Sequence, residues 1–322
     1  MEAFITSLQS VAEIVLVIAL GFWLRNSGKL GDEFKGNISF IIMKIALPAS
    51  IFVSVLKYLN RDKLASLSGG LIFTFASFTI GYIVAWLLTK VFKIRKGRRG
   101  TFINMFVNAN TIFIGLPLNM ALFGTKSLPY FLIYYVMNTI STWAVGIFFI
   151  SNDDPTVKKG DKKEKFNWKK LLPAPLVGFL VSLVFLLLAI PVPGWIDKTL
   201  DMVGGIVTPM SLIYIGIILA DAGLKSIKFD RDTILALVGR FVVAPALMIG
   251  IILLGRSVTG NPLPTIEANS FIIQSAAPGL AVLPILVDSA HGDVDYATNL
   301  VTTSTVLFVI VVPILMQIAN LI

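Results

Sequence analysis

The 322-residue sequence has no cysteine, one histidine and few charged residues. Without cysteine the chain cannot form a disulfide or a thiolate metal site, and His291 alone cannot supply the histidine cluster of a zinc site. Charged residues make up 14% of the chain, whereas hydrophobic residues make up 56% and the mean hydropathy is +0.85. A water-soluble protein of this length could not cover so much apolar surface, so the composition indicates a polytopic membrane protein.

Motifs for several classes of function are also missing. Gly97 and Gly100 flank arginines without the Gly-Lys-Ser/Thr pattern of a nucleotide-binding loop, which argues against ATP-driven transport by this chain alone. The sequence shows neither paired intramembrane aspartates nor a serine with a histidine at membrane depth. We therefore expect a protein that is not an enzyme, uses no metal or other cofactor and binds no nucleic acid.

Apolar stretches of about 20 residues, the length that crosses a bilayer, predict an all-α protein with ten membrane spans. A charged linker at 151–170 divides them into two halves, 1–150 and 171–322. Because each half has an odd number of spans, related halves would form a 5+5 inverted repeat. The expected ranges are 8–24, 37–56, 67–90, 100–122, 128–150, 173–190, 196–220, 232–255, 265–287 and 295–319.

The positive charges predict how the spans are oriented. With the N-terminus outside, the inside loops carry 19 Lys and Arg residues and the outside loops carry 6. This asymmetry favours a multi-pass protein of the plasma (inner) membrane with both termini on the non-cytoplasmic side. The net charge of +9 is then mainly topological. The 151–170 segment is interpreted as a solvated cytoplasmic linker, with binding to lipid or a partner as the alternative.

Two predicted spans are interrupted in their middle. The fourth reads Asn108-Ala-Asn110-Thr111-Ile-Phe-Ile-Gly115-Leu-Pro117, and the ninth reads Ser275-Ala-Ala-Pro278-Gly279-Leu-Ala-Val-Leu-Pro284. Paired interruptions in corresponding halves point to the binding site of a transporter, whereas ordinary proline kinks in a helical bundle are the alternative. A second proline pair, Pro48 and Pro209, keeps nearly the same spacing as Pro117 and Pro284 and supports the repeat.

The chemistry of the interruptions suggests the ligand. Proline lacks an N–H group and fits the first turn of a helix, so new half-helices should start near Pro117 and Pro284. Their positive ends would meet at the middle of the membrane and attract an anion, above all a carboxylate. Donors and acceptors beside them are Asn108, Asn110, Thr111 and Ser275.

The stretch from Asn110-Thr111 through Gly115-Leu-Pro117 to Gly124 resembles the crossover motif of the auxin efflux carrier family. That family includes the plant PIN carriers and bacterial members often described as malate permeases. The stretch from Ala277-Pro278-Gly279 through Pro284 to Pro313 is similar too, and the resemblance covers essentially the whole chain in span number and proline positions.

The resemblance implies a fold like that of the bile-acid/sodium symporters. Spans 1, 2, 6 and 7 would form a panel, or scaffold, domain, and spans 3–5 and 8–10 a core, or transport, domain. Spans 4 and 9 would be the broken, crossing helices, with the substrate between the two domains. Elevator-like movement of the core against the panel would alternate access, and the panel would join two copies in a homodimer.

Two positive charges lie inside predicted spans, where charge is costly and usually functional. Lys44 and Arg240 could balance substrate carboxylates. Alternatively, Lys44 could snorkel or bind carbonyls freed at Pro48, and Arg240 could anchor its span at the cytoplasmic interface. No acidic residue is expected at mid-depth in a core span. The coupling ion therefore stays open, although Asn138, Thr142, Gln274 and Asn299 with backbone carbonyls could hold Na⁺.

Taken together, the sequence predicts a secondary transporter of small organic anions such as malate. An auxin-like exporter of indole acids and a Na⁺-coupled anion symporter are alternatives of the same class. A channel or facilitator is the alternative from a different class.

Overall fold

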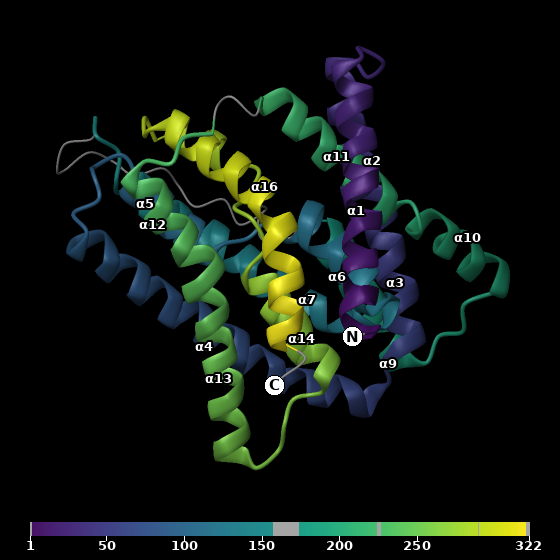
Figure 1. Cartoon of the computed structure of the whole chain (residues 1–322). Helices are drawn as coiled ribbons and strands as arrows, with labels where there is room; N and C mark the ends of the chain where they lie inside the picture. The colour runs from purple at the N-terminus through teal and green to yellow at the C-terminus, as the bar shows by residue number, and fades with distance from the viewer. Residues whose placement is uncertain (1, 157–173, 224–226, 289, 320–322) are drawn as a thin grey trace.

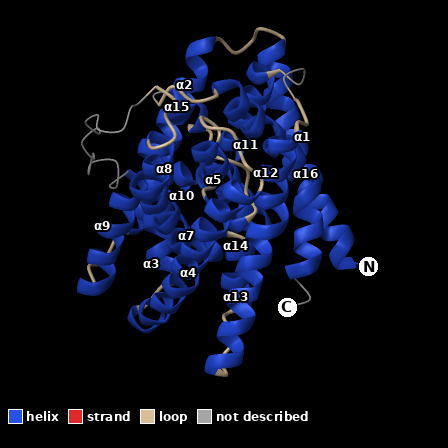
Figure 2. Ribbon diagram, turned by 90° about the vertical axis from the view of Figure 1, so that its left-hand side faces the viewer, coloured by secondary structure: helices blue, strands red, loops and turns tan. Residues whose placement is uncertain are grey.

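The computed structural model describes residues 2–156, 174–223, 227–288 and 290–319, which are helical apart from short connections (Figures 1 and 2). Most of the predicted 151–170 linker lies outside these residues. Five helical segments among them are long and apolar enough to cross a membrane, and a bent pair within the last helix makes a sixth. The chain is thus an all-helical, multi-pass membrane protein, whereas the number of ten spans stays a prediction.

The first half contains five helical stretches, several of them composed of more than one element. A π-helical segment (η1, η2 or η4) joins two α-helices in three of these stretches. The elements are α1 (Glu2–Asn26); α2 (Asp32–Ile41), η1 (Ile42–Ala46) and α3 (Leu47–Tyr58); α4 (Arg61–Val91); α5 (Arg99–Val107), η2 (Thr111–Gly115) and α6 (Leu116–Phe123); and η3 (Thr125–Ser127), α7 (Leu128–Ile140), η4 (Ser141–Gly146) and α8 (Ile147–Ser151).

The second half again shows helical stretches over the predicted ranges. Its elements are α9 (Ala174–Leu188); α10 (Gly194–Gly204) and α11 (Val207–Ala222); α12 (Arg231–Val238), η7 (Gly239–Val243) and α13 (Ala244–Thr259); α14 (Thr265–Ser275) and α15 (Leu283–Asp288); and α16 (Val294–Ala319).

Prolines inside these stretches follow a widened turn of the helix. Pro48, Pro117 and Pro245 each lie in the first turn of an α-helix that directly follows a π-helical segment. Proline cannot donate to the carbonyl four residues earlier and its ring collides with that turn. One wider turn supplies the space. At Pro48 and Pro117 the helix is thus altered by a π-helical segment directly before the proline, and their role as helix breaks stays a prediction.

The helices pack in two groups, and glycines allow close approach in one of them. In the first group α1 packs along α11, and α3 packs against α9 and α10. A side chain at Gly21 would meet the backbone of Ile213, and one at Gly216 the backbone of Ile18. The second group comprises α4, α5, α7 and α8 together with α12, α13 and α14.

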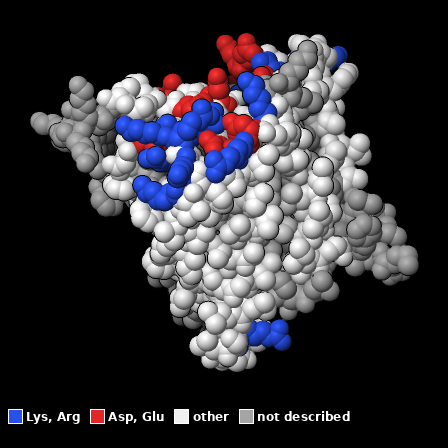
Figure 3. All heavy atoms as spheres, turned by 60° about the vertical axis from the view of Figure 1, so that its left-hand side comes forward, with Lys and Arg blue, Asp and Glu red and all other residues white. Residues whose placement is uncertain are grey.

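Most of the charged side chains visible on one face of the molecule lie at its ends (Figure 3). Lys, Arg, Asp and Glu gather at one end in the space-filling view, whereas the flank below them is almost free of charge (Figure 3). Large apolar side chains are exposed on several helices, among them Ile72 and Phe75 on α4 and Leu254 on α13. An uncharged apolar belt between charged ends is what a bilayer requires of a protein that spans it.

Candidate functional site: the crossing of the two broken helices

Two interrupted helices meet inside the molecule. Helix α5 ends at Val107, and the chain is extended or irregular through Asn110. Helix α14 ends at Ser275, and α15 starts at Leu283. Between them Ala109 and Gly279 form an antiparallel bridge, and the N–H of Asn110 donates to the carbonyl of Pro278 at 2.8 Å. Two segments about 170 residues apart thus satisfy each other's backbone groups, which membrane-buried irregular chain must do.

The first break differs from the proline-based expectation. It begins at Asn108, and helix resumes at Thr111, well before Pro117. The Asn110 side chain caps the new helix by accepting from the N–H of Phe113 at 3.2 Å. Asparagine competes with helical hydrogen bonds and favours caps, so the asparagines rather than the proline set this break. At the second break α15 does start next to Pro284, as expected for a new half-helix, although this helix is only 6 residues long.

Side chains from α7 and α16 hold the bridge. The amide of Asn138 accepts from the N–H of Ala109 and donates to its carbonyl, both at 2.9 Å. On the other strand of the bridge, the N–H of Gly279 donates to Ser304 Oγ at 3.2 Å. Each bridging residue is therefore fixed by a polar side chain from the last helical stretch of its own half of the chain.

The candidate Asn108 is fully occupied by structural hydrogen bonds. Its Nδ2 donates to the Tyr82 hydroxyl at 2.9 Å and to Asn104 Oδ1 at 2.8 Å, and its Oδ1 accepts from Ser141 Oγ at 2.5 Å. All four side chains are buried. This network ties α4, α5 and η4 together beneath the first break, so Asn108 positions the crossing.

Arg240 lies at the centre of the crossing. Its side chain is fully buried, and its Nε donates to the carbonyl of Ala277 at 2.5 Å while Nη1 donates to that of Phe106 at 3.1 Å. One cation thus binds the carbonyls that both breaks leave free. Nη2 has no hydrogen-bond partner among the described residues, and the Tyr134 hydroxyl lies within electrostatic reach. Complete burial does not fit the alternative of an anchor at the water interface.

No acidic residue among those described forms an ion pair with Arg240. An arginine at the middle of a membrane helix costs about 2.5–3.5 kcal/mol even on the most lenient scales. The carbonyls offset part of this cost, but they leave the positive charge uncompensated. The crossing is therefore an electropositive centre in an apolar surrounding.

The other predicted residues divide between the crossing and its surroundings. Thr111 and Gly115 are buried in η2, and Ser275, which donates to the carbonyl of Ile272 at 2.7 Å, is buried at the end of α14. Lys44 lies on η1 with an exposed side chain, on the group of helices formed by α3 and α9–α11. The remaining prolines, Pro48 and Pro209, lie in the first turns of α3 and α11.

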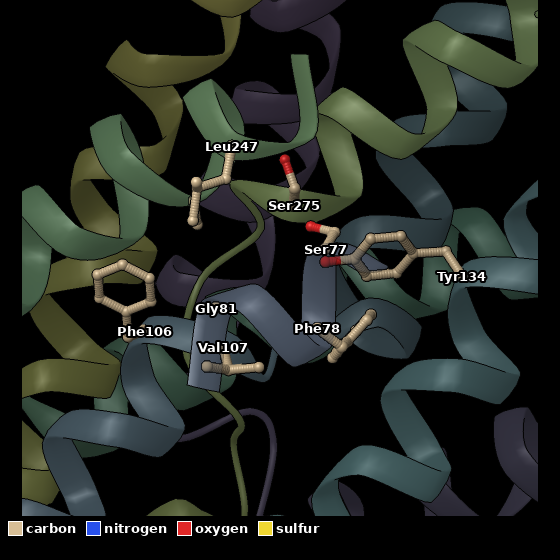
Figure 4. A pocket seen from close by; sticks show the side chains of 9 residues that line it. Ser77, Phe78, Gly81, Phe106, Val107, Tyr134, Leu247 and Ser275 are labelled. Atoms are coloured by element: carbon tan, nitrogen blue, oxygen red, sulfur yellow. The ribbon is translucent and has the colours of Figure 1, made fainter. Parts of the chain in front are cut away.

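A small pocket opens beside the crossing (Figure 4). Three hydroxyl groups, from Ser77, Tyr134 and Ser275, reach into an otherwise apolar lining (Figure 4). Tyr134 connects the pocket to the electropositive centre, since it is also the hydroxyl near Arg240. The lining residues come from α4, α5, α7, α13 and α14: Ser77, Phe78, Gly81, Phe106, Val107, Tyr134, Ala244, Leu247 and Ser275.

Sequence reasoning missed two features of this region. Glu267, in the first turn of α14, is 2% exposed, and it was not singled out from the sequence. Gln274, considered as a Na⁺ ligand, instead links the two halves by donating Nε2 to the carbonyl of Gly115 at 2.8 Å. Glu267 stands two residues inside the predicted ninth span, so its position alone could have marked it as a candidate.

Ion pairs at the charged end join the helical stretches within each group. Arg98 binds Asp230 at 2.7 Å and Asp293 at 2.6 Å and stacks over Tyr296. Burial raises the pKa of Asp230, but hydrogen bonds from Arg98 and Thr233 outweigh it and lower that pKa to about 2. Hydrogen bonds from Thr156 and His291 likewise lower the pKa of Asp154 to about 2, against a smaller effect of burial.

The first group of helices has its own ion cluster. Arg25, at the end of α1, binds Asp221 of α11 at 2.6 Å and also pairs with Asp32 of α2. Lys35 of α2 reaches the same Asp221 at 3.3 Å. Among the described residues, no ion pair joins this cluster to the one around Arg98.

A multi-pass helical protein whose broken helices cross at a buried polar centre has the architecture of a membrane transporter. The chain belongs to the membrane transport protein family, which is the auxin efflux carrier family, and the family's profile matches residues 6–316. The resemblance seen in the crossover motif is thereby confirmed.

Two archaeal relatives are described as uncharacterized transporters. One, from Methanothermobacter thermautotrophicus, is 21% identical over 315 residues, covering 96% of this chain and 97% of the relative. The other, from Methanocaldococcus jannaschii, is 24% identical over 242 residues, covering 73% of this chain and 76% of the relative. Similarity therefore extends along nearly the whole chain.

Proposed function

We propose that the protein is a secondary transporter of small organic anions, with carboxylates such as malate as the substrate class. The observation that carries this proposal is Arg240, a buried cation at the crossing with an unpartnered Nη2 and no acidic partner among the described residues. A carboxylate can accept from a guanidinium and neutralise its charge at once. In our proposal the carboxylate bound to Arg240 is surrounded by Asn110, Thr111, Ser275 and Gly279.

The position of Lys44 refines the substrate proposal. Lys44 is exposed on the other group of helices, whereas Arg240 is buried at the crossing. The crossing therefore offers one fixed positive charge, enough for one carboxylate. We propose that any second carboxylate of a dianion faces the opposite group of helices, where movement could bring Lys44 into reach.

The proposed architecture is ten spans in a 5+5 inverted repeat with a bile-acid/sodium symporter-like fold. The matched roles of Asn138 and Ser304, each holding the break of its own half, support the repeat. Helix α1 ends and α16 begins at the charged end, so their other ends point away from it. With the charged end cytoplasmic, both termini lie on the non-cytoplasmic side of the plasma membrane.

The two groups of helices would be the panel domain (spans 1, 2, 6 and 7) and the core domain (spans 3–5 and 8–10). The separate ion clusters around Arg25 and Arg98 support this division, because each cluster joins helices of one group only. Among the described residues, no ion pair crosses the boundary between the groups. Elevator-like movement of the core against the panel would expose the crossing to each side in turn, and the panel would join a homodimer.

Uptake into proteoliposomes tests the proposal. Radiolabelled malate should enter with saturable kinetics, and Arg240→Gln should reduce the initial rate at least tenfold. Arg256→Gln, an exposed cation at the far end of the same helical stretch, should keep the wild-type rate. Equal rates for wild type and Arg240→Gln in folded protein would reject the role of Arg240.

A thermal-shift screen of the purified protein identifies the substrate, because a ligand that binds the folded state raises the melting temperature of the protein. The screen covers mono-, di- and tricarboxylates and indole acids, each with and without Na⁺. A shift with indole acids alone would favour an auxin-like exporter, and one that requires Na⁺ would favour a symporter. Turnover far above about 10³ s⁻¹ would instead indicate a channel.

A further inference from the structure

Helix α14 carries a stripe of buried polar side chains with unsatisfied atoms. Glu267 Oε1, Ser270 Oγ and Gln274 Oε1 each lack a hydrogen-bond partner among the described residues. Their spacing of three and then four residues places them on one face of the helix. The stripe runs from the outer part of α14 to its last turn, where Gln274 binds Gly115 at the crossing. Helix α6, which packs against α14, adds the unpartnered Asn119 Oδ1.

Glu267 begins this stripe in an apolar setting. Its side chain is 2% exposed, and no ion pair joins it to another described residue. Gly70 of α4 makes room for it, because a β-carbon there would lie 2.2 Å from Glu267 Oε1. Phe271 and Ile133 close the same space. An ionised carboxylate without a partner is very costly in such surroundings, so the neutral, protonated acid is the form that fits.

The described side chains around Glu267 offer little to compensate a negative charge. Tyr130 of α7 lies within electrostatic reach but is itself uncharged at neutral pH. The neighbouring η3 and α13 carry Lys126 and Arg256, whose side chains are exposed, and α6 and η2 contain no titratable residue. Asp295 and Tyr296, on α16, lie near Arg98 at the charged end. The charge state of Glu267 therefore depends on whether water reaches it.

We propose that Glu267 is a proton-binding site that couples transport to the pH gradient, and that the polar stripe of α14 connects it to the crossing. Buried polar atoms without protein partners are satisfied by water in most folds, and acidic side chains with such groups form the proton relays of membrane transporters. Glu267 would bind a proton from the water on one side before it is buried, and it would release that proton when movement of the core exposes it to water on the other side. This inference rests on the transport activity proposed above.

Proteoliposomes containing the full chain test the coupling. Malate uptake is measured with pH 6 outside and pH 7 inside and again with pH 7 on both sides, and the ratio of the two accumulated amounts is compared. A coupled proton multiplies accumulation by up to about tenfold for each pH unit, so the wild-type ratio should be several-fold. Glu267→Gln, which mimics the protonated acid, should give a ratio near one whatever its own rate. Glu33→Gln, with an exposed side chain on α2, is the matched control and should keep the wild-type ratio.

A wild-type ratio near one, or an unchanged ratio in Glu267→Gln, would overturn the coupling. A second measurement depends neither on uptake nor on a variant that folds. A hydrophobic carbodiimide reacts with protonated carboxyls in apolar surroundings, and mass spectrometry of the wild-type protein locates the adduct. Labelling of Glu267 at pH 6 that weakens at pH 8 supports the proton site even if malate proves not to be the substrate. Equal labelling at both pH values, or none, rejects it.

Discussion

Single buried side chains replace the helical hydrogen bonds that the two breaks remove. Asn138 satisfies both backbone groups of Ala109, and Arg240 binds the carbonyls of Ala277 and Phe106. A buried backbone group left without a partner costs about 1–3 kcal/mol. A few polar residues at the crossing therefore decide whether an irregular chain can exist inside the membrane at all.

The amide of Asn138 offers a direct test of this view. Asn138→Ala would leave the N–H and carbonyl of Ala109 unpaired and should lower stability by about 2 kcal/mol or more. The melting temperature of the detergent-solubilised protein measures the effect. Asn152→Ala, which removes an exposed amide bonded to the carbonyl of Phe148, should change it little. Similar melting temperatures for both variants would contradict a stabilising role of the two hydrogen bonds between Asn138 and Ala109.

Asp230 gives the fold a defined acid sensitivity. Hydrogen bonds from Arg98 and Thr233 lower its pKa to about 2 despite burial, so the ionised form stabilises the folded state. That contribution is complete above the ordinary carboxyl pKa near 4 and is lost as the pH falls toward 2. Asp230→Asn should therefore lower the melting temperature at pH 7 and narrow its gap to wild type by pH 3. Asp201→Asn, exposed on α10, should follow wild type throughout.

At the scale of elements, close helix pairs depend on missing side chains. A β-carbon at Gly21 would lie 2.3 Å from the carbonyl oxygen of Ile213, so Gly21→Ala must push α1 away from α11. Such overpacking costs about 1–3 kcal/mol, and the melting temperature should fall. Gly250 of α13 has open space around it, so Gly250→Ala should be neutral or stabilising by up to about 1 kcal/mol. A fall of equal size in both variants would show that close packing of α1 against α11 is not the cause, because Ala has the higher helix propensity.

The sequence predicts the helical stretches well because hydrophobic length is read directly from the chain. It also identifies both interrupted segments, although the non-helical residues of the first one lie at its asparagine end. A proline in a membrane helix can be accommodated by a wider turn, as at Pro117. Asn108, by contrast, finds a partner on another helix, the hydroxyl of Tyr82, which no local pattern displays. Ser304 and Gln274 were undervalued for the same reason, since their partners lie 25 and 159 residues away.

Burial is the other quantity that the sequence could not supply. Arg240 and Lys44 are equivalent as charges within predicted spans, yet the first is fully buried and the second is exposed. The position of Glu267 in a predicted span is visible in the sequence, but the burial of its side chain is not. Which face of a membrane helix meets protein and which meets lipid depends on its neighbours, and an apolar sequence gives little sign of either.

At the scale of the whole molecule, two ion clusters stabilise two groups of helices separately. The boundary between the groups includes aromatic contacts, such as Phe113 of η2 against Tyr214 of α11, whose ring centroids are 4.5 Å apart, and a hydrogen bond between the hydroxyls of Tyr58 and Thr125 at 2.7 Å. Such contacts can slide or separate without leaving buried charges unpaired. A boundary of this kind suits movement between two rigid bodies.

Cross-linking tests that movement, and the absence of native cysteine makes every introduced thiol unique. Phe113→Cys with Tyr214→Cys, joined by a short thiol-reactive linker, should stop malate uptake, and a cleavable linker should restore it on reduction. Phe52→Cys with Phe185→Cys is the matched control within one group, between α3 and α9, where the rings are 5.2 Å apart. Undiminished uptake through the Phe113–Tyr214 link would show that the two groups need not move.

The bridge between Ala109 and Gly279 has one further consequence. It is made by main-chain N–H and C=O groups, which every amino acid except proline supplies. Selection can therefore exchange many side chains around the meeting point to suit a new solute while the meeting point itself survives. The architecture and the substrate can therefore change separately in evolution. Relatives that share a fifth to a quarter of their residues with this chain could keep the same architecture and transport different substrates.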